Sequence, residues 1–368
     1  MQREGRRRSS SPSLATRSRV HTISFQALDH LRSVAVDPNF EIAARNAVCN
    51  ALGLEAGDRL AIVAETGLDA IAASLVAAAE AAGVEVTAVL VDADRVRSEP
   101  FVERLEAILA DVDGSIFVGS VAGLPKAFRR RLLRTAGTRR RHAHMAGIGA
   151  EMMRQSMRAD WSEVDRISHE VAARLGSARR LLVTTSTGSS LEVELDPARP
   201  WCVGSGWLRA PGWTNLPGGE VYASPRSVEG VLVPDGGIWL PDGSDLGRDG
   251  RLRLVLTDGR LDLVEGDQRA AARLLEVLDA QPHGRRVGIV GLGTNVSILA
   301  PTGMLLQDLK MPGVHLTFGA TVAQQTGADW DSLLEVPALV RRPDVWADGD
   351  PIMVRGRYAR SLLERGLP

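Results

Sequence analysis

The sequence predicts an α/β N-terminal domain with a parallel sheet, followed by a mainly β (α+β) C-terminal domain. From residue 38 to about 150, short apolar runs alternate with helical stretches. This alternation is the pattern of a parallel sheet wrapped by helices. After residue 178 the chain changes to short strands separated by Gly- and Pro-rich segments, which favours a mainly β half. A length of 368 residues suits two ordinary domains or one large one.

The first half contains predicted strands and helices in alternation. The strands are apolar runs at 59–64, 84–91 and 115–120, and the helices lie at 68–82, 100–109 and 127–135. Gly83 supplies the stop between the first helix and the second strand, since glycine is the preferred residue just past a helix end. A further helix over 160–176 begins at Asp160, a residue type that caps helix N-termini.

The second half contains short strands and one amphipathic helix. A Gly/Ser turn between two apolar runs predicts a hairpin over 181–195. The remaining predicted elements are strands at 230–233, 237–240, 252–256, 261–264 and 286–290, a helix at 267–278, and a final hairpin at 344–358 that turns at Asp348–Gly349.

This pattern divides the chain into four parts. They are a basic, disordered tail and lead-in at 1–37, an α/β domain at 38–150, a linker helix at 151–178 and a mainly β, catalytic-type domain at 179–368. Residues 1–19 are rich in Arg and Ser. They lack the apolar stretch that a secretory signal needs, so a solvated tail is expected.

Composition excludes several classes of protein. A net charge of −1 excludes bulk electrostatic binding to nucleic acid, and no nucleic-acid partner is expected. Two cysteines, Cys49 and Cys202, cannot form a disulfide framework or a four-thiolate zinc site. No run of about 18 apolar residues occurs, so we expect no membrane span and a cytoplasmic location.

Two conspicuous sequence features carry little chemistry. Arg139–His144 places three arginines before two histidines without interleaved aromatics, which predicts a solvated surface rather than a nucleic-acid contact. Gly288–Asn295 resembles a phosphate-binding glycine turn, but Val296 stands where the dinucleotide fingerprint needs its third glycine. No nucleotide cofactor is therefore expected.

Four residues of the second half are candidate metal ligands. Glu220 follows a tight Pro-Gly-Gly turn, His315 lies in an apolar run, and Asp329 and Asp331 flank Trp330. In an extended segment the two aspartates point to the same face. One imidazole and three carboxylates suit Zn, Mn or Fe. A histidine packed in the core and a solvated Asp-x-Asp loop explain the same residues without a metal, and both interpretations stay open here.

Several sequence blocks resemble a known family. They are NLPGGEVYASP…VEGVLV, GLGTN, HLTFG and WDSLLEVPALVRRPDVWADGDPIMVRGRY. Together they resemble the aminopeptidase T (thermophilic metallo-aminopeptidase) family, whose scaffold is shared by the related 2,5-dihydroxypyridine 5,6-dioxygenases. The resemblance runs from about residue 48 to the C-terminus. It implies an N-terminal α/β domain, a mainly β metal-bearing domain and assembly as a homo-oligomer, expected to be a dimer.

The resemblance carries over only part of the family's metal site. Glu220 matches the metal-linked Glu of the Gly-Glu-Val segment, His315 matches the family His, and Asp331 matches the Asp of a His-x-Asp pair. The chain departs from the family elsewhere. Ile289 stands where a second Glu is usual, and Val322 stands where a Tyr is common. Asp329 takes the place of the other His, so the resemblance implies a divergent member with an incomplete ligand set.

The resemblance implies a divergent metal-dependent hydrolase of the aminopeptidase T type that acts on a peptide or amide bond. Glu220, His315, Asp329 and Asp331 would hold the metal, and Glu220 would act as the general base. The expected cofactor is one divalent metal ion (Zn, Mn or Fe) or none, and the expected partner is a small peptide or small-molecule substrate. Two alternatives remain: a mononuclear non-haem metal oxygenase of the dihydroxypyridine dioxygenase type, and a metal-free, non-catalytic scaffold or binding protein.

Overall fold

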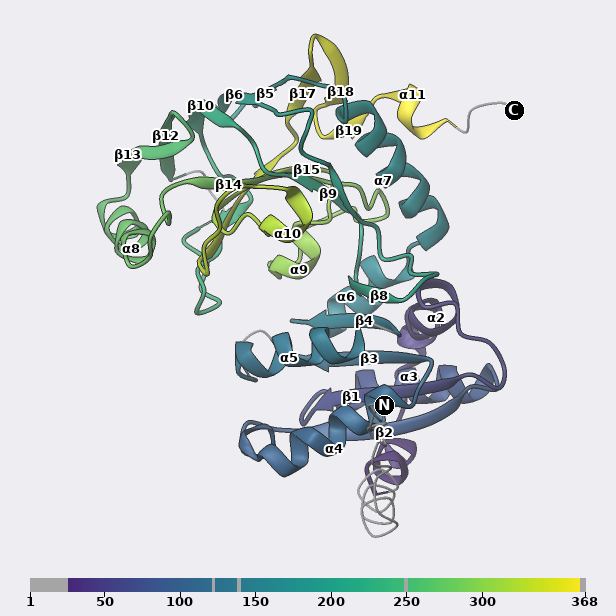
Figure 1. Ribbon diagram of the computed structural model, residues 1–368. Helices are drawn as coiled ribbons and strands as arrows, with labels where there is room; N and C mark the ends of the chain where they lie inside the picture. Colours follow the sequence, from purple (N-terminus) through teal and green to yellow (C-terminus); the bar gives the residue numbers. More distant parts are fainter. Residues whose placement is uncertain (1–25, 121–122, 138–139, 248–250, 365–368) are drawn as a thin grey trace, which may run out of the picture.

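The structure is a computed structural model that describes residues 26–120, 123–137, 140–247 and 251–364 (Figure 1). A parallel sheet with helices forms from the early part of the chain, and two antiparallel sheets form later. This arrangement confirms the predicted fold class. The predicted tail lies outside the described residues as far as residue 25. Residues 26–33 are helical, and Leu28 and Leu31 are buried there.

Sheet A has five parallel strands in the order β2-β1-β3-β4-β8. Its strands are β1 Arg59–Glu65, β2 Glu85–Val91, β3 Gly114–Gly119, β4 Arg141–Ala146 and β8 Gly212–Asn215. The helices between them are α3 Asp69–Ala81, α4 Glu99–Ala110 and α5 Lys126–Ala136. Ile62 and Val63 lie in different core clusters, so β1 is buried on both faces. That double burial explains its continuous apolar run.

Short helical segments complete the first half. They are η1 Pro38–Phe40, α2 Glu41–Arg45, η2 Asn46–Ala51, η3 Arg95–Arg97, α6 Ala150–Arg154 and η4 Ser156–Arg158. The predicted strands and helices before residue 137 are confirmed to within one residue at each end. Strand β8 was not foreseen in this sheet. It comes from beyond residue 178 and pairs with β4, where His144 lies beside Asn215.

Sheets B and C are mainly antiparallel and share one apolar core. Sheet B has the strand order β13-β12-β10-β6-β5-β17-β18-β19. Its strands are β5 Arg180–Thr184, β6 Ser190–Glu194, β10 Ser227–Leu232, β12 Leu252–Thr257, β13 Arg260–Gly266, β17 Asp344–Ala347, β18 Asp350–Val354 and β19 Arg357–Tyr358. Sheet C has the strand order β11-β16-β15-β14-β9-β7. Its strands are β7 Cys202–Gly204, β9 Glu220–Ala223, β11 Gly237–Ile238, β14 Val287–Gly293, β15 Gly313–Gly319 and β16 Glu335–Arg341.

The later helices are α7 Trp161–Leu175, α8 Gln268–Asp279, α9 Leu305–Asp308, α10 Ala323–Thr326 and α11 Arg360–Leu363. The predicted helix over 267–278 and the hairpins over 181–195 and 344–358 are confirmed. No helix in the described ranges is both long enough and apolar enough to cross a bilayer.

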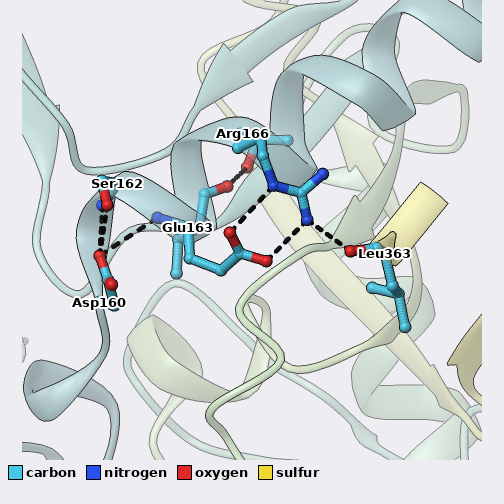
Figure 2. Close-up of polar contacts among 7 residues, drawn as sticks. Asp160, Ser162, Glu163, Arg166 and Leu363 are labelled. Carbon is cyan, nitrogen blue, oxygen red and sulfur yellow. Dashed lines mark hydrogen bonds and ion pairs between the residues drawn. The ribbon is translucent and has the colours of Figure 1, made fainter. Parts of the chain in front are cut away.

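Helix α7 connects the two halves of the molecule (Figure 1). Its predicted cap is confirmed, because the Asp160 carboxylate accepts hydrogen bonds from the backbone N–H groups of Ser162 and Glu163 at 3.0 and 3.3 Å. Figure 2 shows that Arg166 donates both to Glu163 and to the carbonyl oxygen of Leu363, the latter at 2.8 Å. The helix therefore holds the C-terminal segment through Arg166.

The prediction of a solvated surface at Arg139–His144 is wrong for the histidines. Both lie on β4, an interior strand of sheet A, with His142 fully buried and His144 5% exposed. Ser115 Oγ lies 2.8 Å from His142 Nδ1, and His142 Nε2 lies 3.3 Å from His144 Nδ1. Burial lowers the pKa of His142 to about 3 and that of His144 to about 2. Both rings are therefore neutral at pH 7. The arginines before them made a buried strand resemble a solvated segment.

These two histidines predict a loss of stability on acidification. The unfolded chain takes up protons near pH 6.5 while the folded rings do not, so stability falls as pH drops from 6.5 towards 3. Each ring contributes a loss of about 1.4 kcal/mol between pH 7.5 and 5.5. Urea unfolding at the two pH values measures it. His144→Gln should remove one ring's share of this pH-dependent loss of stability. His169→Gln, at an exposed position, should not. Equal pH dependence of the unfolding free energy in wild type and both variants would refute the assignment.

Candidate functional site

Two glycines of β14 create the space for a polar site in sheet C. Gly291 lies between Tyr222 of β9 and His315 of β15 in the strand register, and Gly293 pairs with Glu220. Glu220 and Tyr222 are two residues apart on one strand, so they share a face. A Cβ on Gly291 would lie only 2.2 Å from His315 Nε2. The imidazole therefore fills the volume that a side chain at residue 291 would need.

Gly293 allows the backbone of residues 310 and 311 to cross the strand. A Cβ at this position would lie 2.0 Å from the carbonyl oxygen of Met311 and 2.7 Å from the carbonyl carbon of Lys310. The crossing brings Lys310 beside Glu220. Its Nζ forms an ion pair with Glu220 Oε1, and the two side chains are 2% and 13% exposed. We call Lys310, Glu220 and His315 the charge cluster.

The imidazole of the charge cluster is neutral at pH 7. His315 is 4% exposed. Burial is the main cause that lowers its pKa to about 4; Glu220 raises the pKa and Lys310 lowers it. The positive charge that faces Glu220 therefore comes from the Lys310 ammonium and not from an imidazolium. A buried carboxylate needs such a partner, because an unpaired buried charge is strongly destabilising.

Tyr222 extends the cluster towards α10. Its hydroxyl donates to Oε1 of Gln325, and Cys202 of β7 lies opposite it in the strand register. Burial first, and then the nearby charge of Glu220, raise the pKa of the phenol above its ordinary value of 10.0. Tyr222 is thus a neutral hydrogen-bond donor at pH 7.

The loop before Glu220 is fixed by the loop after β14. Gly219 has a φ of +110°, and a Cβ there would lie 2.6 Å from the Asn295 Cβ. The Asn295 amide donates to the carbonyl oxygen of Gly218 at 3.2 Å, and the N–H of Thr294 donates to that of Gly219 at 2.7 Å. The NLPGGE and GLGTN blocks therefore form one packed unit, which explains why they occur together.

The structure brings together two of the four residues predicted to bind metal. Glu220 and His315 belong to the charge cluster. The side chain of Asp329 is 82% exposed and pairs with Arg199 at 3.2 Å. Asp331 instead accepts hydrogen bonds from the backbone N–H groups of Thr321 and Ser332 at 2.8 and 2.9 Å.

The residues present do not fit a bound divalent metal in this arrangement. Within the described ranges, no three His, Cys, Asp or Glu side chains gather as a metal-binding group. The Lys310 ammonium already pairs with the Glu220 carboxylate, which the metal would need as a ligand. Ile289 and Val322, where the resemblance predicts a Glu and a Tyr, have no donor atom in their side chains. The metal assignment of the four residues stays a prediction that this donor set does not support.

The comparisons with known proteins place the fold. No known family profile and no curated protein matches the chain. Among solved structures, it is similar to 2,5-dihydroxypyridine dioxygenase from Pseudomonas putida KT2440, with 16% identity, a TM-score of 0.68, and coverage of 89% of this chain and 100% of that one. It is also similar to wild-type AmpT from Thermus thermophilus, with 19% identity, a TM-score of 0.64, and coverage of 87% and 99%. The chain thus shares the fold of an aminopeptidase and a dioxygenase, while family membership stays a prediction.

Sequence reasoning missed Lys310 and the two glycines of β14. Lys126 and Lys310 are the only lysines in a chain whose other basic side chains, apart from histidine, are arginines. A lone lysine five residues before His315 was therefore a usable signal. Glycines inside a strand mark places where another segment approaches closely, whereas the Gly-Leu-Gly run was interpreted as a phosphate turn and as part of a family block.

Replacing Gly291 by Ala should destabilise the protein by about 1–3 kcal/mol. The new Cβ would overlap the His315 ring at 2.2 Å and displace it from the charge cluster. Gly176→Ala is the matched control, because its Cβ would meet nothing closer than 3.4 Å and its φ is not positive. Urea unfolding measures both variants. Equal stability of Gly291→Ala and wild type would contradict the placement of His315.

Proposed function

We propose that the chain is a metal-independent binding protein built on the fold that aminopeptidase T and dihydroxypyridine dioxygenase share. The observation that carries the proposal is the buried ion pair between Lys310 and Glu220. In this arrangement the lysine supplies the positive charge that a divalent ion would otherwise bring to Glu220. The expected ligand is a small peptide or another small molecule.

Electrostatics supports this proposal over a metal site. A divalent ion at Glu220 would have to displace the Lys310 ammonium, whose side chain is 2% exposed. The ammonium would then lie buried beside the two positive charges of the metal ion. Such repulsion is strong in a buried environment. Catalytic zinc sites generally use three protein ligands, whereas the charge cluster offers the carboxylate of Glu220 and the imidazole of His315.

A metal-dependent hydrolase of a peptide or amide bond is the second candidate. It is favoured by one observation: Glu220 and His315, which match family metal positions, lie together around Gly291 and Gly293. Under this alternative Lys310 must leave Glu220, and Asp329 must leave Arg199. The oxygenase alternative requires the same rearrangement, so one measurement tests both.

Wild-type protein purified without a metal-affinity step should hold far less than one equivalent of Zn, Mn or Fe, including after incubation with each ion. Lys310 already neutralises Glu220, so metal binding gains little. Lys310→Met removes the competing ammonium, and we expect its metal content to exceed that of wild type. Inductively coupled plasma mass spectrometry measures both proteins.

Two further variants control this comparison. Lys126→Met, at an exposed position, should behave as wild type. Lys310→Met alone leaves a buried charge unpaired and should lose about 3–5 kcal/mol of stability, part of which Lys310→Met/Glu220→Gln should restore. About one equivalent of metal in wild type, lost in His315→Ala, would overturn the proposal and favour the hydrolase or the oxygenase.

A further inference from the structure

A cavity of about 520 Å³ lies between the end of sheet B and the loop that follows β14. Strand β19 and helix α11, at the top of Figure 1, contribute Tyr358 and Leu363 to its lining. Its lining contains the basic side chains of Arg341, Arg342, Arg355 and Arg357, which we call the rim, and apolar side chains that include Met311, which we call the floor. Cavities of this size commonly hold small organic ligands.

Three of these arginines have no ion-pair partner among the described residues. Arg342, Arg355 and Arg357 are exposed. Over the described ranges, no Asp or Glu side chain forms an ion pair with any of them, whereas Arg341 lies 4.0 Å from Asp235. Guanidinium groups bind carboxylates and phosphates through paired hydrogen bonds. The rim therefore offers unused donors for an anion.

Two of these arginines have positive φ values, which residues with a side chain seldom adopt. Arg355 and Gly356, with φ values of +47° and +73°, form the tight turn between β18 and β19, and Arg342 has a φ of +49°. Such turns favour Asn-Gly over Arg-Gly. Unfavourable backbone conformations that persist are concentrated at functional sites.

The two turns pack against each other and set the rim. The N–H of Gly356 donates to the carbonyl oxygen of Pro343 at 2.8 Å, and a Cβ on Gly356 would lie 2.8 Å from the Arg342 Cα. The backbones of Arg342 and Arg355 are thus held close together, and Arg357 follows two residues after Arg355. The same contact explains why residue 356 is a glycine.

The floor of the cavity is continuous with the charge cluster. Met311 and Pro312 line the cavity directly after Lys310. Tyr358 also lines it, and its hydroxyl donates to the carbonyl oxygen of Gly293 at 2.7 Å. The segment that places Lys310 on Glu220 is therefore also one wall of the cavity.

We propose that this cavity binds a small amphipathic anion, whose apolar body lies on the floor while its carboxylate or phosphate meets Arg342, Arg355 and Arg357. This inference rests on the proposed function, since it names the ligand class that a metal-independent binding protein would take. Both head groups present oxygens that a guanidinium recognises, and the binding experiment distinguishes them.

Isothermal titration calorimetry of the full chain in EDTA tests the proposal with three probes. They are N-acetyl-Leu-Phe with a free carboxylate, the same dipeptide as its C-terminal amide, and octyl phosphate. We expect one or both anions to bind at least tenfold more tightly than the neutral amide, and the tighter anion identifies the head group. Absence of binding by both anions, or equal binding of the amide, would overturn the proposal.

Variants separate the arginines from the fold. Arg355→Asn suits the turn, so Arg355→Asn/Arg357→Gln should stay folded by circular dichroism and bind the anion at least tenfold more weakly. Arg360→Gln, outside the cavity lining, should bind as wild type. Unchanged affinity in the double variant would overturn the proposal. Metal content measured on the same preparation before EDTA is added reports separately on the proposed function, so failure of the cavity inference alone is distinguishable.

Discussion

The ion pair between Lys310 and Glu220 is the interaction on which the architecture of the site depends. It exists because Gly293 lets residues 310 and 311 cross β14, and because Gly291 leaves room for the ring of His315. Neither buried charge is tolerable alone. The NLPGGE loop, β14 and the segment that contains Lys310 are therefore constrained to one another, and the rest of sheet C packs around them.

This arrangement changes the chemistry of a shared fold. The chain has the fold of a dioxygenase and an aminopeptidase, yet its site contains a lysine ion pair, a neutral imidazole and a neutral phenol. His315 is neutral because burial lowers its pKa, and Tyr222 is neutral because burial raises its pKa. A site of this kind can bind and orient a ligand by hydrogen bonds and one fixed pair of charges.

The sequence predicted the elements that are set by local pattern and missed the contacts set by packing. Strands such as β1 are continuous apolar runs because both faces are buried, and Asp160 is recognisable as a cap from its type alone. His142 and His144 were missed because the arginines before them resemble a solvated segment. Glu220 and His315, both singled out from the sequence, lie together in the structure. The pairing of Glu220 with Lys310 was missed, since Lys310 reaches it only through the crossing over Gly293.

The most direct test is nuclear magnetic resonance of protein labelled with ¹⁵N at its side-chain lysine nitrogens, because Lys126 and Lys310 are the only lysines in the chain. A buried ion pair predicts a slowly exchanging ammonium signal from Lys310 that persists when one equivalent of Zn²⁺ is added. Exposed Lys126 should exchange quickly and serves as the internal reference. Two results would contradict a stable Lys310–Glu220 ion pair that excludes a metal. One is a Lys310 signal that exchanges as fast as that of Lys126. The other is a Lys310 signal that one equivalent of Zn²⁺ removes and EDTA restores.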